Sequence, residues 1–102
     1  MNIYLANQIG TQFYKIGITK KDPTIRVKEL QIGNATELIL ITSFTTKHGF
    51  KLETALHNRY VLQQVNSEWF EFTDEEISLF IDVCTKLEES FDVLKKYNNP
   101  FI

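Results

Sequence analysis

The first nineteen residues alternate between apolar and polar side chains, and this period of two indicates a β-hairpin at the start of the chain. Residues 2–6 and residues 12–19 are rich in β-forming side chains, and the Asn, Gly and Thr between them are typical of a turn. Tyr4, Lys15 and Gly17 fall on one face, which we expect to point away from the core. The opposite face carries the expected core residues: Ile3, Leu5, Tyr14, Ile16 and Ile18.

The segment after the hairpin has the start and stop signals of a short helix. Asp22 is a suitable N-cap, Pro23 suits the first helical position, and Gly33 is a natural end. The apolar stripe of this helix is expected to contain Ile25, Leu30 and Ile32.

The middle of the chain predicts a strand, a helix and a second short strand. Residues 37–45 are rich in β-forming side chains, and residues 49–64 are predicted to be helical. Residues 68–72 form the short strand. In the helix, the residues expected to be partly buried are Phe50, Leu52, Ala55, Leu56 and Tyr60.

A Thr-x-x-Glu pattern at Thr73 and Glu76 predicts the start of a long helix over residues 74–97. Its apolar side chains recur at helical spacing from Ile77 to Leu94, so one side is expected to pack on the rest of the protein. The predicted element order is ββαβαβα. This order indicates an α+β fold with a small antiparallel sheet of three to four strands flanked by helices.

The length of 102 residues fits one domain over residues 1–102, with a core at 1–72 and a closing helix at 73–98. The formal charge of −2 is unevenly distributed. Residues 1–33 carry five basic and two acidic side chains, whereas residues 73–102 carry three basic and seven acidic ones. Because charges act over a Debye length of roughly 8–10 Å, a polyanion could bind the basic part. The single cysteine excludes an internal disulfide and a cysteine-rich zinc site.

Several side chains have the chemistry that phosphodiester hydrolysis requires. The reaction needs a group that deprotonates water, a cation near the developing negative charge, and a carboxylate that can hold a divalent metal. Taken singly, each candidate has an ordinary structural explanation, as a half-buried sheet residue or a solvated surface charge. The candidates are Tyr4, Lys15, Arg26, the Glu53–His57 pair at helical spacing, and Glu68.

These residues occur in a characteristic order of motifs: Asn2-Ile3-Tyr4, Lys15-Ile16-Gly17-Ile18-Thr19, Arg26, Glu53 to His57, and Glu68-Trp69-Phe70. Over residues 2–72 this order resembles the GIY-YIG endonuclease superfamily, in particular the phage and bacterial branch whose second signature reads KIG. The chain departs from the superfamily in two places. The first signature lacks its leading glycine, and Lys15 replaces the tyrosine of the second. Tyr14 is adjacent but lies on the opposite strand face, so we expect Tyr14 in the core and Lys15 in the site.

The resemblance implies a role for each matching residue. Tyr4 would lie near the attacking water, Arg26 would stabilise the scissile phosphate, and Glu68 would bind a single Mg²⁺ or Mn²⁺ ion. Lys15 and His57 are the further catalytic candidates. The expected substrate contacts are Gly17, Lys20 and Lys21.

The leading hypothesis is a metal-dependent endonuclease that hydrolyses phosphodiester bonds in DNA, without exclusion of RNA. The alternative is a catalytically weak or inactive module of the same fold that binds nucleic acid or a protein partner. The acidic C-terminal helix would be the surface for a homodimer or another protein. No secretory signal or membrane span is recognisable, so we expect the cytoplasm of a bacterial cell or a phage-infected host.

Overall fold

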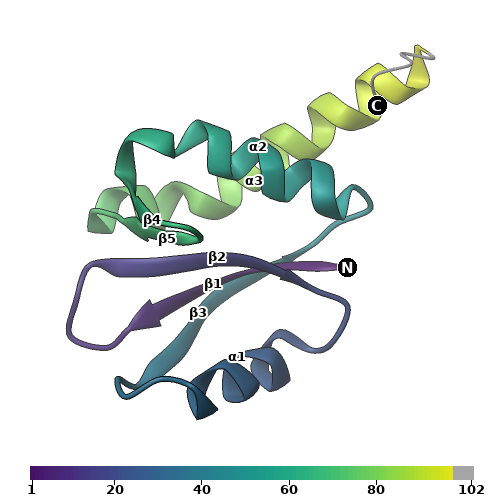
Figure 1. The fold of residues 1–102 in the computed structure, drawn as a ribbon. Helices are drawn as coiled ribbons and strands as arrows, with labels where there is room; N and C mark the ends of the chain where they lie inside the picture. The colour runs from purple at the N-terminus through teal and green to yellow at the C-terminus, as the bar shows by residue number, and fades with distance from the viewer. Residues whose placement is uncertain (98–102) are drawn as a thin grey trace.

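The computed structural model describes residues 1–97 and contains an antiparallel five-stranded sheet between helical layers. The strand order is β3-β1-β2-β5-β4. Helix α1 covers one face of the sheet, and α2 and α3 cover the other (Figure 1). The α+β class is as predicted, but the sheet has one strand more than expected. The elements are β1 (Asn2–Gln8), β2 (Phe13–Thr19), α1 (Pro23–Ile32), β3 (Leu38–Thr45), α2 (Gly49–Arg59), β4 (Gln64–Asn66), β5 (Trp69–Glu71) and α3 (Asp74–Lys96).

The hairpin of β1 and β2 separates two apolar clusters, one on each face of the sheet. The larger cluster lies under α2 and α3 and contains the residues expected in the core, including Leu5, Tyr14 and Ile16. The smaller cluster lies under α1 and contains Tyr4 and Ala6. The expectation that Tyr4 points away from the core was therefore wrong, because α1 covers that face and leaves Tyr4 only 2% exposed.

Helix α1 begins and ends where its sequence signals predicted. The Asp22 side chain accepts a hydrogen bond from the Thr24 N–H at 2.8 Å, and Gly33 ends the helix. The predicted apolar stripe was wrong in part, because Ile25 and Ile32 are 52% and 89% exposed. Val27 is the buried residue, and together with Leu30 it forms the i, i+3 pair that contacts the sheet.

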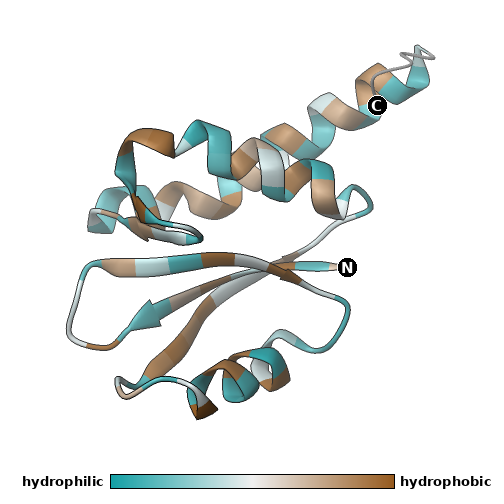
Figure 2. Cartoon of the chain, viewed as in Figure 1, coloured by the Kyte–Doolittle hydropathy of each residue, from teal (hydrophilic) through white to brown (hydrophobic). Residues whose placement is uncertain are grey.

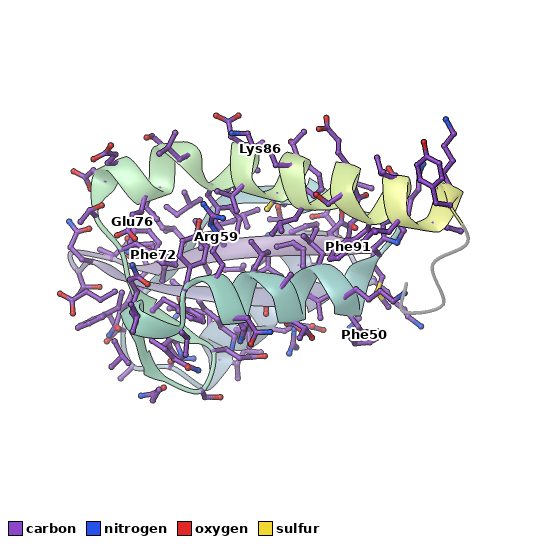
Figure 3. The ribbon with its side chains drawn as sticks, turned by 90° about the horizontal axis from the view of Figure 1, so that it is seen from above. Phe50, Arg59, Phe72, Glu76, Lys86 and Phe91 are labelled. Carbon is purple, nitrogen blue, oxygen red and sulfur yellow. The ribbon has the colours of Figure 1, made fainter. Side chains whose placement is uncertain are left out.

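The predicted helix over residues 49–64 is shorter than expected. Helix α2 ends at Arg59, and a 3₁₀ turn at Val61–Gln63 leads into the unpredicted strand β4. Ser67, with a positive φ of 38°, allows the tight return into β5. Phe50 was expected to be partly buried but is 66% exposed and lies on the outer side of α2 (Figure 3).

Helix α3 starts at the predicted capping box. The Glu76 N–H donates to Thr73 Oγ1 at 3.2 Å, and the Thr73 N–H donates to Glu76 Oε1 at 3.0 Å. Phe80 and Cys84 are buried in the larger cluster, whereas the last turns project beyond the sheet and mix apolar with polar side chains (Figures 1 and 2). None of the helices within residues 1–97 is long and apolar enough to cross a membrane.

Candidate active site at the open edge of β2

The short length of β5 leaves part of β2 without a neighbouring strand. Strand β5 pairs with β2 only from Phe13 to Lys15, and the Ile16 N–H then donates to the Glu68 carbonyl at 3.2 Å. Beyond this point, no described strand pairs with this edge of β2. His57 of α2 reaches the same edge, where its Nε2 lies 3.2 Å from the Ile16 carbonyl oxygen. Groups from both faces of the sheet therefore meet at the open edge of β2.

Tyr4 and Gly17 are directly opposite each other in the hairpin. A Cβ atom at residue 17 would lie 2.7 Å from Cε1 of Tyr4 and closer still to its Cζ and Oη atoms. The ring of Tyr4 thus occupies the space that any other residue at this position would fill. The absence of a side chain at Gly17 therefore leaves room for the phenol.

The electrostatic surroundings of Tyr4 keep its hydroxyl protonated at neutral pH. Burial raises the pKa of Tyr4 above its usual value of 10.0. A hydrogen bond and the charge of Arg26 oppose this rise, while the charges of Glu68 and Glu53 add to it. Tyr4 is therefore suited to orient a bound group through its hydroxyl, within reach of a guanidinium.

Lys15 and Glu68 form an ion pair across the junction of β2 and β5. The Lys15 side chain is 13% exposed, that of Glu68 is 41% exposed, and Lys15 Nζ lies 5.9 Å from the centre of the Trp69 ring. Tyr14 is buried on the opposite face, as expected, and Lys15 shares the face of Tyr4 and Gly17. The bond to Lys15 uses Oε2 of Glu68.

Helix α2 contributes the carboxylate of Glu53, a candidate residue to which the sequence assigns no role of its own. Burial raises the pKa of Glu53; the neighbouring His57 lowers it, Glu68 raises it and Lys15 lowers it. Glu53 is therefore close enough to His57, Glu68 and Lys15 for their charges to change its pKa. The spacing of four residues between Glu53 and His57 was the signal for this placement.

His57 has a defined orientation at the edge of the site. Its ring packs edge-on against Phe70, with ring centres 5.1 Å apart. Because the Ile16 carbonyl can only accept, the contact at 3.2 Å places the proton on Nε2 and leaves Nδ1 as the acceptor. The structure thus assigns the neutral ring one tautomer.

The basic side chains around α1 differ in how close they lie to this cluster. Arg26 is 40% exposed, and its NH1 lies 3.5 Å from Glu29 Oε1. Lys21 donates to the other Glu29 oxygen at 2.7 Å, and this bond is the main reason why the pKa of Glu29 lies below its usual value. Lys20 is exposed, and no described contact joins it to Tyr4 or Glu68. Of the three cations, Arg26 is the one near enough to Tyr4 to lower its pKa.

The carboxylates of the candidate site have the chemistry that a magnesium ion needs. Mg²⁺ takes oxygen ligands and is commonly held by one or two carboxylates, with waters and substrate phosphate completing the shell. Within residues 1–97, no group of three or more His, Cys, Asp or Glu side chains could enclose a metal by itself. The Oε1 atom of Glu68 is not used by the bond to Lys15, and Glu53 lies near. These carboxylates therefore fit a Mg²⁺ ion whose other ligands are water and substrate phosphate.

Comparison with known protein families gives one match. The family model described as T5orf172 domain matches residues 1–85, which include every residue of the candidate site. Neither the curated proteins nor the solved structures gave a significant match.

Proposed function

Because the chain belongs to the T5orf172 domain family, a phage-associated family related to nuclease-like domains, we propose that it is a metal-dependent endonuclease of the GIY-YIG type that cleaves DNA. The observation that carries this proposal is the Lys15–Glu68 ion pair at the open edge of β2, together with the charges of Arg26, Glu53 and Glu68 that act on the buried Tyr4 hydroxyl. Two cations can stabilise negative charge on a phosphate, two carboxylates can hold a metal ion, and a buried phenol can orient the attacking water.

Arg26 is the proposed phosphate ligand. Its guanidinium has five N–H donors, and the single ion pair with Glu29 at 3.5 Å leaves most of them free for phosphate oxygens. Lys15 adds a second positive charge on the same face as Tyr4. Together the two cations would stabilise the negative charge that grows on the phosphate as water attacks.

Water activation would be shared between Tyr4 and a proton acceptor. Tyr4 keeps its own proton at neutral pH, so its hydroxyl positions the water and does not act as a phenolate base. His57 presents Nδ1 as an acceptor, and we assign to it the removal of the proton. Lys15 would assist by offsetting the negative charge of Glu68.

Glu68 is the proposed metal ligand, with Glu53 as the neighbouring carboxylate. A Mg²⁺ ion at this place would supply Lewis-acid stabilisation of charge at the phosphate. The ion pair with Lys15 means that Glu68 is already oriented by a protein contact before any cation binds.

Nicking of supercoiled plasmid DNA tests the proposal. Wild-type protein should produce open-circular plasmid with Mg²⁺ or Mn²⁺ and not with EDTA. Arg26→Ala and Glu68→Gln should each reduce the rate at least 100-fold, since each removes a charge from the reaction centre. Arg59→Ala on α2 and Glu71→Gln on β5 are matched controls, because both residues are exposed and lie outside the cluster.

Two results would contradict the assignment in different ways. Cleavage that survives both Arg26→Ala and Glu68→Gln would show that these residues are not the reaction centre. Failure of the folded wild-type protein to cleave any DNA or RNA, with salt-sensitive binding retained, would favour a binding function.

One observation favours the alternative of a module that binds nucleic acid or protein and cleaves weakly or not at all. Lys15 stands where the superfamily signature has a tyrosine, and it binds the carboxylate proposed for the metal. If this ion pair prevents metal binding, Lys15→Tyr should raise the nicking rate. If Lys15 takes part in the reaction, the same substitution should lower it.

A further inference from the structure

A hollow of about 320 Å³ lies beside the candidate active site, where the ends of several elements meet. Trp69 connects the two places, because its ring lies under Lys15 Nζ and it directly follows Glu68 in the chain. The residues that line the hollow are Gln8, Phe13, Asn34, Val65, Asn66 and Trp69.

The lining combines aromatic and amide side chains and carries no charge. Phe13 and Trp69 offer aromatic surface, on which a nucleobase of any type can stack. Three side-chain amides offer both donors and acceptors, which match the mixed donor and acceptor groups of base edges. The Asn34 amide already donates to the Leu30 carbonyl at 2.8 Å, whereas those of Gln8 and Asn66 donate to no group within residues 1–97. This chemistry suits a base and not a phosphate.

The position of the hollow also suits a base that neighbours the bound phosphate. Phe13 and Lys15 are two residues apart in β2, so they share one face at a spacing of roughly 7 Å. This spacing corresponds to about two base steps of a stacked strand at roughly 3.4 Å each. A strand whose phosphate lies between Arg26 and Lys15 can therefore place a nearby base against Trp69.

We propose that this hollow binds one unpaired base of the strand whose phosphate the candidate active site holds. The inference rests on the proposed function and specifies its substrate. A base inside a duplex stacks on its neighbours and presents only its edges, so it cannot lie flat on Trp69 unless it leaves the stack. The preferred substrate would then contain a single-stranded, looped or flipped nucleotide next to the cleavage point.

Fluorescence of 2-aminopurine tests the proposal through binding alone. The probe is a 20-base-pair duplex with one unpaired 2-aminopurine, measured in EDTA so that cleavage does not contribute. The fully paired duplex and a duplex with an abasic residue at the unpaired position are the comparisons. The unpaired base should be quenched on binding, and its removal should weaken affinity at least five-fold, as expected for the loss of one stacked base.

Two substitutions connect the effect to the hollow. Trp69→Leu should abolish the quenching and the preference for the unpaired base, while Trp69→Phe should retain most of both. Val65→Glu places a charge at the rim without disturbing the core, since Val65 is 52% exposed, and it should reduce the preference as well. Val93→Glu on α3 is the matched control at 53% exposure and should leave the preference unchanged.

The outcomes separate this inference from the proposed function. Equal affinity for the abasic, unpaired and fully paired duplexes would overturn the base site, whether or not the protein cleaves DNA. A preference for the unpaired base that is lost in Trp69→Leu, without cleavage in Mg²⁺, would support the base site and contradict the nuclease. A preference that survives both Trp69→Leu and Val65→Glu would place the base elsewhere and overturn the inference.

Discussion

Replacement of Gly17 by alanine should be among the most damaging small changes in this protein. The added Cβ would lie 2.7 Å from Tyr4 Cε1 and closer to Cζ and Oη, whereas ordinary contact begins at 3.4 Å. The ring cannot move aside easily, because Tyr4 is 2% exposed and packs with Val27 and Leu38. Relieving this overlap therefore requires a shift of the hairpin or of α1 by about 1 Å.

The expected cost follows from the behaviour of overpacked cores. Forcing extra atoms into a closely packed interior costs about 1–3 kcal/mol, and the short distances at Gly17 place this substitution near the upper end. A loss of about 3 kcal/mol would lower the melting temperature of a domain of this size by roughly 12–24 °C. Urea titration and thermal melting followed by circular dichroism would measure both quantities.

A double-mutant cycle identifies the cause of the loss. Tyr4→Leu removes the three ring atoms that the new Cβ would meet, so its combination with Gly17→Ala should be less destabilising than the two separate effects added, by about 1 kcal/mol or more. Gly33→Ala is the control, because nothing lies within 4 Å of a Cβ there, and it should stay within about 0.5 kcal/mol. A loss below about 0.5 kcal/mol for Gly17→Ala, or strict additivity in the cycle, would refute the steric explanation.

Three further predictions concern the C-terminal helix. Thr73→Ala removes the capping box and should cost about 1 kcal/mol, measured as a decrease of roughly 4–8 °C in melting temperature. The hydrogen bond from His48 at 2.8 Å holds the pKa of Asp92 below its usual 3.8, so this contribution is complete above that pH and is lost as the pH falls through the lower folded-state pKa. Asp92→Asn, but not Asp82→Asn, should therefore make the urea midpoint less dependent on pH below about 4. Burial raises the pKa of the Cys84 thiol to about 12, so Ellman's reagent at pH 8 should react with the unfolded chain and not with the native protein.

The faces of the hairpin could be predicted from the sequence because a strand places successive side chains on opposite sides. This rule puts Tyr4, Lys15 and Gly17 together without any knowledge of the rest of the fold. It does not say which helix covers that face. Burial of Tyr4 depends on α1 folding back with Val27 against the sheet, and local periodicity carries no information on that contact.

The end of α2 and strand β4 were missed for a local reason. Residues 60–64 contain no glycine or proline, so nothing in the sequence marks the end of the helix at Arg59. Strand β4 has three residues, too few to show an alternating pattern. Its position depends on pairing with β5, which the tight turn at Ser67 permits.

The sequence yields a list of candidate residues, but not how the two faces of the sheet bring them together. Period-two alternation assigns Lys15 to the face of α1, and helical spacing places Glu53 and His57 on one side of α2, which covers the opposite face. These groups would remain apart if β5 continued along β2, because a paired strand would separate them. Because β5 begins only at Trp69, Glu68 lies just outside the paired segment, where its carboxylate forms an ion pair with Lys15 and its charge raises the pKa of Glu53. A site built across a strand edge thus depends on where the neighbouring strand stops, and that length is set by tertiary pairing and not by the residues of the strand alone.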